Sequence, residues 1–273
     1  MDCLRLLMKR DSLAVHGLSK KQIYSKALAL REQGRLFNPK NAGHADTFKG
    51  SVDRFCEIAY RLRHSKKVLD VGAGSGILLF LLAELGHECY GADVYNTAET
   101  AEVYTAKGIR SITCNIEADS LPFPDCFFDA VVCCQALEHF THSHLGPVKE
   151  MGRVLRAGGI IEADVPNAVC FHNRSRIIRG KHITWDYKQH YLYAKPVIYK
   201  GLSFYPDRHN REFTRDELHL LFDECGFKNV DVYFLKSRRH RVGLEKVKSL
   251  GSALRDLVPS LRKTLIAFAE KGG

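Results

Sequence analysis

The chain has 273 residues, a formal net charge of +10 and nine cysteines without a C-x-x-C pair. Its length suffices for one large domain or a domain with additions, and 45% hydrophobic with 26% charged residues is ordinary for a globular protein. The sequence has neither an apolar run of the ~20 residues that a membrane helix needs nor a signal-peptide core at its start. These features disfavour a membrane-spanning or disulfide-built protein, and we expect a cytoplasmic chain with reduced thiols.

Residues 1–63 are expected to form an N-terminal helical segment ahead of the main domain at 64–273. A helix with charged faces is predicted over 20–33, and a turn-rich stretch at 38–43 precedes a second helix over about 46–63. These helices could pad a sheet or cover a ligand pocket, and the residues leave both roles open.

The stretch KVLDVGAGSG, at 67–76, predicts a strand, a tight turn and a helix, in that order. The predicted strand ends in the acid Asp70, and Gly72, Gly74 and Gly76 follow. Glycine permits positive φ and close approach to a ligand, and the free N–H groups of the next helix attract an anionic group. The spacing departs from the dinucleotide fingerprint G-x-G-x-x-G. A ligand with an amino group, a carboxylate and a sulfonium fits the acid and the turn.

This stretch resembles the first motif of the class I S-adenosylmethionine-dependent methyltransferases, in the type 11-like branch that acts on small molecules, lipids and glycans. The resemblance extends in order over 66–167, through LPFPD at 121–125, FDAVV at 128–132, QALEH at 135–139 and RVLRAGG at 153–159. It implies an α/β, Rossmann-like, doubly wound seven-stranded sheet whose last strand is antiparallel, with N-terminal helices and an insertion after strand 5. It also implies the cofactor S-adenosyl-L-methionine.

The second predicted strand, over 88–93, ends in Asp93, at about the distance from the glycine turn where an acid reaches ribose hydroxyls. Asp93 could instead cap the next helix, but the preceding motif favours the ribose. A third strand over 109–114 leads to Asn115, where family members commonly carry an acid that meets the adenine amino group. The resemblance implies the cofactor-binding residues Asp70, Gly72, Gly74, Gly76, Asp93, Val94, Asn115, Ile116 and Gln135.

After a fifth strand at 160–165, residues 168–212 are rich in Arg, Lys and aromatic side chains, and we expect a substrate-covering insertion. Its cations could hold a phosphate or carboxylate of a small acceptor, or its cations and aromatics could hold single-stranded RNA. The aromatics could also be the insertion's own core. We rank a small-molecule, lipid or glycan acceptor above nucleic acid. The predicted substrate-binding residues are His142, Trp185, Tyr187 and Arg211.

Methyl transfer from a sulfonium is an in-line displacement that depends on alignment more than on a fixed triad. A hydroxyl acceptor gains from a general base. His139, just after the fourth strand at 128–134, and His209 are the predicted catalytic residues, as base or substrate anchor. The histidines at 139, 142 and 144 lack a partner acid or cysteine at a standard ligand spacing, so no metal site is predicted.

Downstream we predict a capped helix over 214–225, a sixth strand over 229–235, a basic helix over about 244–257 and a reversed last strand at 264–269. The function indicated is S-adenosylmethionine-dependent O-methylation of a small, lipid- or sugar-linked acceptor that can be anionic. Two alternatives stay open: an RNA methyltransferase that uses the basic C-terminal half, and a non-catalytic scaffold with the same fold. The sequence does not indicate an oligomeric state.

Overall fold

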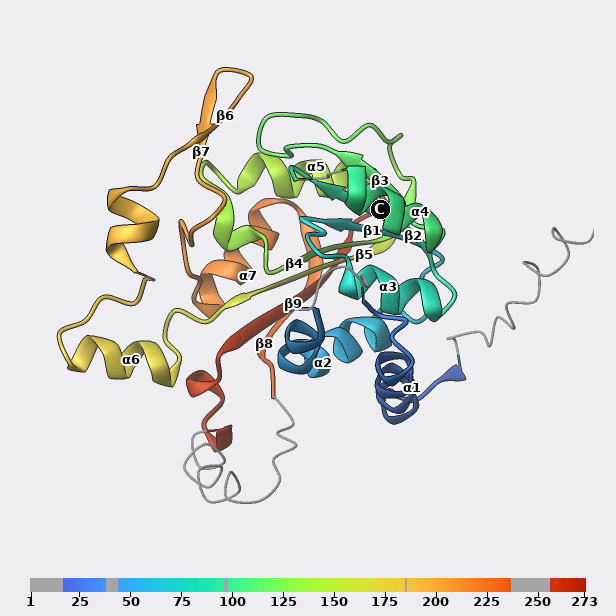
Figure 1. Ribbon diagram of the computed structural model, residues 1–273, viewed down its shortest axis with the longest axis horizontal. Coiled ribbons are helices and arrows are strands. Elements are labelled where there is room, and N and C mark those ends of the chain that lie inside the picture. The colour runs from blue at the N-terminus through green and yellow to red at the C-terminus, as the bar shows by residue number, and fades with distance from the viewer. Residues whose placement is uncertain (1–16, 38–43, 96–97, 185, 237–255) are drawn as a thin grey trace, which may run out of the picture.

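The computed structural model describes residues 17–37, 44–95, 98–184, 186–236 and 256–273. Trp185 and most of the basic helix expected at 244–257 lie outside these ranges. The described strands form a seven-stranded sheet in the order β3-β2-β1-β4-β5-β9-β8 (Figure 1). Their bounds are β1 Lys67–Val71, β2 Glu88–Asp93, β3 Arg110–Thr113, β4 Phe128–Cys134, β5 Leu155–Pro166, β8 Phe227–Phe234 and β9 Thr264–Lys271.

The first five strands pair in parallel, whereas β9 runs antiparallel to both of its neighbours, β5 and β8. The predicted doubly wound sheet with a reversed last strand is therefore confirmed. The chain winds outward from β1 to β3 and then returns to place β4 against the other side of β1. Ligands bind such sheets beyond the carboxyl ends of the strands at this change of direction. The site should therefore lie above β1 and β4.

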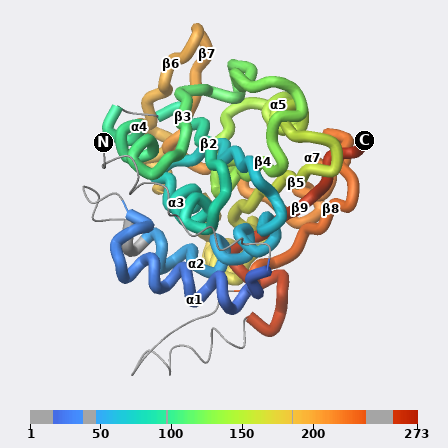
Figure 2. Tube along the Cα trace, turned by 90° about the vertical axis from the view of Figure 1, so that its right-hand side faces the viewer, coloured from blue at the N-terminus to red at the C-terminus, as the bar shows by residue number. Residues whose placement is uncertain are grey.

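Helices cover both faces of the sheet (Figure 2). One core joins a sheet face to α1 (Lys20–Glu32), α2 (His44–Arg61), α3 (Ile77–Glu84) and α4 (Ala98–Ala106), and the other joins the opposite face to α5 (Leu145–Val154) and α7 (Arg215–Glu224). Helix α3 is apolar on every side, and it is enclosed on every side, since each residue from Ile77 to Ala83 is buried. None of the helices in the described ranges has the length and apolarity that a bilayer crossing requires.

The insertion after β5 carries three short elements that the sequence did not indicate. They are α6 (Phe171–Ile178), a π-helical turn (Lys188–Leu192) and a hairpin of β6 (Val197–Tyr199) with β7 (Leu202–Phe204), and they extend from one end of the sheet (Figure 1). The base of the insertion is closed by a bridge between Asn167 and Phe213 and by the hydrogen bond from Ala168 N to Phe213 O (2.9 Å). The insertion therefore returns to the sheet where it left it, beside the carboxyl ends of the strands.

Candidate active site

The glycine turn after β1 has a backbone that only glycine adopts readily. Gly72, Gly74 and Gly76 have φ values of +80°, +50° and +73°, in the left-handed region that disfavours other L-residues. The N–H of Gly72 donates to Ala92 O (2.8 Å), which joins the turn to β2. The three glycines are therefore a conformational requirement of this turn.

Asp93, at the end of β2, is fixed by the same turn. Its two carboxylate oxygens accept hydrogen bonds from Gly74 N (2.8 Å) and Tyr95 N (2.7 Å). Each oxygen retains acceptor capacity for a further donor, such as a ribose hydroxyl. The backbone bonds hold the carboxylate at the wall of a cavity.

This first cavity, of about 290 Å³, is called the cofactor cavity below. It lies over the carboxyl ends of β1, β2 and β4, and its wall contains six of the nine residues predicted to bind the cofactor. These six are Gly72, Asp93, Val94, Asn115, Ile116 and Gln135. Gly74 and Gly76 shape the turn behind the wall, and Asp70 lies deeper.

Asp70 is 2% exposed and does not line the cavity. Burial, with the nearby charge of Asp93, raises its pKa well above the ordinary range, and its Oδ1 is buried without a hydrogen-bond partner. In the sheet register Asp70 and Glu162 flank Val132 from opposite sides. Buried carboxylates without matching cations are costly, and the raised pKa of Asp70 offsets that cost because it favours the neutral acid.

The sequence analysis missed a group of buried charged residues near this acid. Arg54, on α2, lies under the sheet with its Nε 3.3 Å from Asp164 Oδ1, and Gln135 Nε2 donates to that same oxygen (2.7 Å). Glu162 and Asp164, on β5, are fully buried. Two acids at alternate positions of an otherwise apolar strand were the signal for this cluster. Through Asp164, Arg54 supports the orientation of Gln135.

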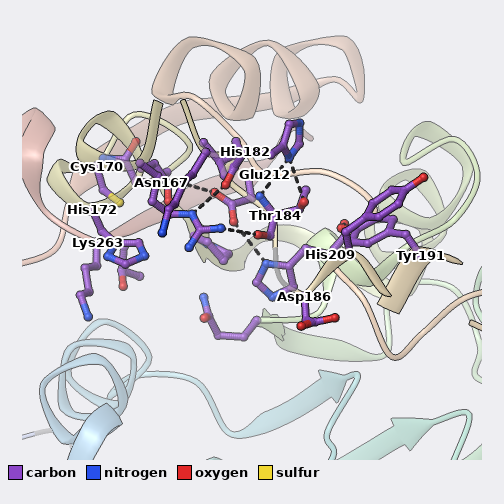
Figure 3. A pocket seen from close by; sticks show the side chains of 18 residues that line it. Asn167, Cys170, His172, His182, Thr184, Asp186, Tyr191, His209, Glu212 and Lys263 are labelled. Atoms are coloured by element: carbon purple, nitrogen blue, oxygen red, sulfur yellow. Dashed lines mark hydrogen bonds and ion pairs between the residues drawn. The ribbon is translucent and has the colours of Figure 1, made fainter. Parts of the chain in front are cut away.

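A second cavity, of about 1080 Å³, is called the acceptor cavity below. The insertion forms most of its wall, with Cys170, His172, His182, Thr184, Asp186, Tyr191, His209 and Glu212, and Asn167 and Lys263, from outside the insertion, also line it (Figure 3). Gln135 lines both cavities. It is a non-glycine residue at φ +52°, a conformation that costs free energy and is concentrated at functional sites.

His139 and His209 bring the two cavities into contact. His139 lines the cofactor cavity and His209 the acceptor cavity, and their rings meet edge to face with centroids 5.0 Å apart. Burial and the proximity of His209 lower the pKa of His139, so its imidazole is neutral at neutral pH.

Asn210 fastens the insertion to this point. Its N–H donates to Glu138 O (2.7 Å), and its Nδ2 donates to His139 O (2.8 Å) and Tyr205 O (3.0 Å). These bonds tie the chain around His209 to the loop that follows β4. The proximity of the two histidines is therefore built into the backbone.

Only some of the predicted substrate-binding residues line the acceptor cavity. Tyr187 lines the acceptor cavity. His142 lines neither cavity, and its backbone N–H and Nδ1 both bond Glu117 Oε2 (2.8 and 3.2 Å). Arg211 also lies outside both cavities and pairs with Glu217. Trp185 falls outside the described residues.

The strand order, the glycine turn, Asp93 and the cavity above β1 and β4 are those of the class I S-adenosylmethionine-dependent methyltransferase fold. Comparison with known proteins agrees with this fold. A family profile described as "Methyltransferase domain" matches residues 69–163.

Two sequence relatives cover different lengths of the chain. An uncharacterized methyltransferase, YcgJ of Bacillus subtilis, is 36% identical over 36% of this chain and 39% of its own length. A demethylmenaquinone methyltransferase of Tropheryma whipplei is 27% identical over 60% of this chain and 67% of its own. The chain thus spans from about two fifths to two thirds of these relatives.

Solved structures share the fold over most of the chain. The Haloferax volcanii protein described as a putative methyltransferase, in complex with the Trm112 activator, has a TM-score of 0.54 at 16% identity, covering 92% of this chain and 98% of that one. The 1,6-didemethyltoxoflavin-N1-methyltransferase of Burkholderia thailandensis, with bound S-adenosylhomocysteine, has a TM-score of 0.52 at 17% identity, covering 92% and 88%.

Proposed function

We propose that this protein transfers the methyl group of S-adenosylmethionine to a hydroxyl oxygen of a small molecule held in the acceptor cavity. The observation that carries the proposal is that the two cavities meet at Gln135 and at the His139–His209 contact. A donor on one side and an acceptor on the other would react across this junction.

The cofactor cavity has the groups that S-adenosylmethionine needs. Asp93 would hold the ribose hydroxyls, the glycine turn the methionine part, and Asn115 with Ile116 the adenine. Asn115 Oδ1 accepts one hydrogen bond, from Glu117 N (3.1 Å), so a second lone pair of this oxygen and the amide N–H groups remain for the adenine. When bound, the cofactor supplies an activated methyl group on a positively charged sulfur.

The acceptor cavity combines aromatic surface with positive charge. Tyr187 and Tyr191 line it with their rings 6.2 Å apart and nearly parallel, and Lys181 and Lys263 contribute cations. Arg176 Nε donates to His182 O (2.7 Å), so this guanidinium supports the wall. A planar or lipid-linked acceptor with an anionic group fits this lining. The demethylmenaquinone methyltransferase relative is also named for a small-molecule acceptor.

The reaction leaves one task to the side chains at the junction, namely removal of the hydroxyl proton. The O–H bond breaks, an O–CH₃ bond forms, and the CH₃–S bond breaks with its electron pair on sulfur, giving S-adenosylhomocysteine and one proton. His139, whose imidazole is neutral, and His209 lie where this proton must leave. Holding donor and acceptor in line and dry supplies most of the rate acceleration.

The test combines cofactor titration with a transfer assay. Purified protein is titrated calorimetrically with S-adenosylmethionine and then incubated with labelled cofactor and fractionated metabolite extracts, and products are identified by mass. We expect His139→Gln and His209→Gln to keep cofactor binding and to slow transfer by ~10²–10⁴-fold. His219→Gln, on the exposed face of α7, serves as the matched control.

Three outcomes would contradict the proposal. Failure to bind S-adenosylmethionine would indicate the non-catalytic scaffold. Tight retention of RNA with a steep salt dependence, and methylation of RNA alone, would indicate the RNA methyltransferase. Full transfer activity in both histidine variants would show that the two histidines at the junction take no part in methyl transfer.

A further inference from the structure

Three potential metal-ligand groups, including both histidines of the junction, lie close together. One carboxylate oxygen of Glu138 and one imidazole nitrogen each from His139 and His209 all lie within 4.8 Å of one another. Glu138 and His139 belong to the short 3₁₀ helix after β4 (Leu137–His139), and His209 comes from the end of the insertion. The sequence predicted no metal here because the spacing of neighbouring histidines cannot show a ligand that arrives from a distant segment.

Glu138 is the group that most needs an explanation. The residue is 1% exposed, and its Oε2 is buried without a hydrogen-bond partner. The guanidinium of Arg54 is also near this region, but it forms its ion pair with Asp164 (3.3 Å). A carboxylate buried in this way costs several kcal/mol unless a cation or donor meets it.

The two histidines have outer partners of the kind that orient metal ligands. His209 Nδ1 lies 3.4 Å from Glu212 Oε1, and Asn173 Nδ2 donates to Glu212 Oε2 (2.6 Å). If Nδ1–H donates to Glu212, Nε2 carries the lone pair that is available to a metal ion. The backbone carbonyls of Pro206 and Arg208 are hydrogen-bond acceptors for the His139 ring. Carboxylate and carbonyl partners of this sort fix the tautomer and direction of ligating imidazoles.

We propose that Glu138, His139 and His209 bind a divalent transition-metal cation at the junction of the two cavities. Two imidazoles and one carboxylate form a set that suits such ions and leaves coordination positions open. Ligand atoms around an ion at ~2.1 Å lie about 3.0–3.5 Å apart. Binding therefore requires the groups to close by roughly an ångström.

This inference rests on the proposed function and specifies its chemistry. A cation at this point would take the acceptor hydroxyl in an open position and lower its pKa, as a Lewis acid does. The proton then leaves to solvent, the oxygen takes the methyl group, and sulfur keeps the electron pair of the broken bond. The metal changes no oxidation state. Acceptors with two adjacent oxygens would bind best because they can fill two positions.

The test measures metal binding by itself. Full-length protein, freed of any affinity tag and dialysed against EDTA, is titrated with MnCl₂ by calorimetry and with CoCl₂ by visible absorption. We expect one ion per chain with a Kd on the order of micromolar. Glu138→Gln and His209→Gln should each weaken binding at least ~10-fold, whereas His219→Gln should leave it unchanged.

Controls separate this proposal from the proposed function. Thermal melting and titration with S-adenosylmethionine establish that each variant is folded with an intact cofactor cavity. Absence of stoichiometric binding at millimolar metal, or equal affinity in the wild type and both ligand variants, would overturn the metal site. Transfer that continues at full rate in EDTA would also overturn it while leaving the methyltransferase assignment in place.

Discussion

Gly76 offers a quantitative test of the glycine turn because the structure predicts two separate penalties for a side chain there. An added Cβ would lie 2.2 Å from Tyr104 Cε1 and 2.6 Å from its hydroxyl. Tyr104 is 2% exposed, and its hydroxyl donates to Gly74 O (3.2 Å), so the ring cannot move aside freely. Gly74 is the matched control, since its φ is also positive but its Cβ would meet only Gly72 O at 3.9 Å.

Both Gly74→Ala and Gly76→Ala should lose about 1–2 kcal/mol of unfolding free energy from the left-handed backbone. Gly76→Ala should lose a further 1–3 kcal/mol or so from overpacking against Tyr104. Urea unfolding followed by circular dichroism measures the two losses. Replacing Tyr104 by alanine removes the obstacle, so Gly76→Ala should lose less unfolding free energy in that background. The loss caused by Gly74→Ala should stay the same. Equal losses for the two glycine variants, or no relief on truncating Tyr104, would refute the reasoning.

Three further variants test other parts of the site and its support. Asp93→Ala should weaken S-adenosylmethionine binding by ~10–100-fold in calorimetry, because two charge-assisted hydrogen bonds are worth about that much. Arg54→Met leaves Asp164 as an uncompensated buried charge and should lower the unfolding free energy by about 3–5 kcal/mol in urea. Hydrogen bonds from Arg153 lower the pKa of Glu150, so this carboxylate stabilises the fold above its ordinary pKa and stops doing so as pH falls through the lowered value. Glu150→Gln should therefore cost about 1–2 kcal/mol at pH 7, and the gap should close on acidification below about pH 4.5; a gap independent of pH would contradict this.

The fold could be predicted because its main signals are local. The glycine turn, the acid at the end of β2 and the turn before β4 each lie within a few consecutive residues, and parallel strands bring their carboxyl ends to one edge. Asp93 and Asn115 therefore reach one cavity, as expected from their positions at strand ends.

The junction could not be predicted in the same way because it joins distant segments. His209 reaches His139 only through the insertion, whose path depends on the three hydrogen bonds of Asn210. Arg54 lies in α2, one of the helices for which the sequence left open whether they pack on the sheet or cover a ligand pocket. Its contact with Asp164 shows that α2 supports the floor of the site. The two acids of β5 mark that strand in the sequence, but no local pattern shows which distant residue contacts them.

The central claim is that donor and acceptor occupy two cavities that meet at Gln135, and a crystal structure with bound S-adenosylhomocysteine tests it most directly. We predict the ribose hydroxyls on the carboxylate of Asp93 and the sulfur directed past Gln135 toward His209. A cofactor product bound elsewhere, or one whose sulfur faces away from the acceptor cavity, would contradict it.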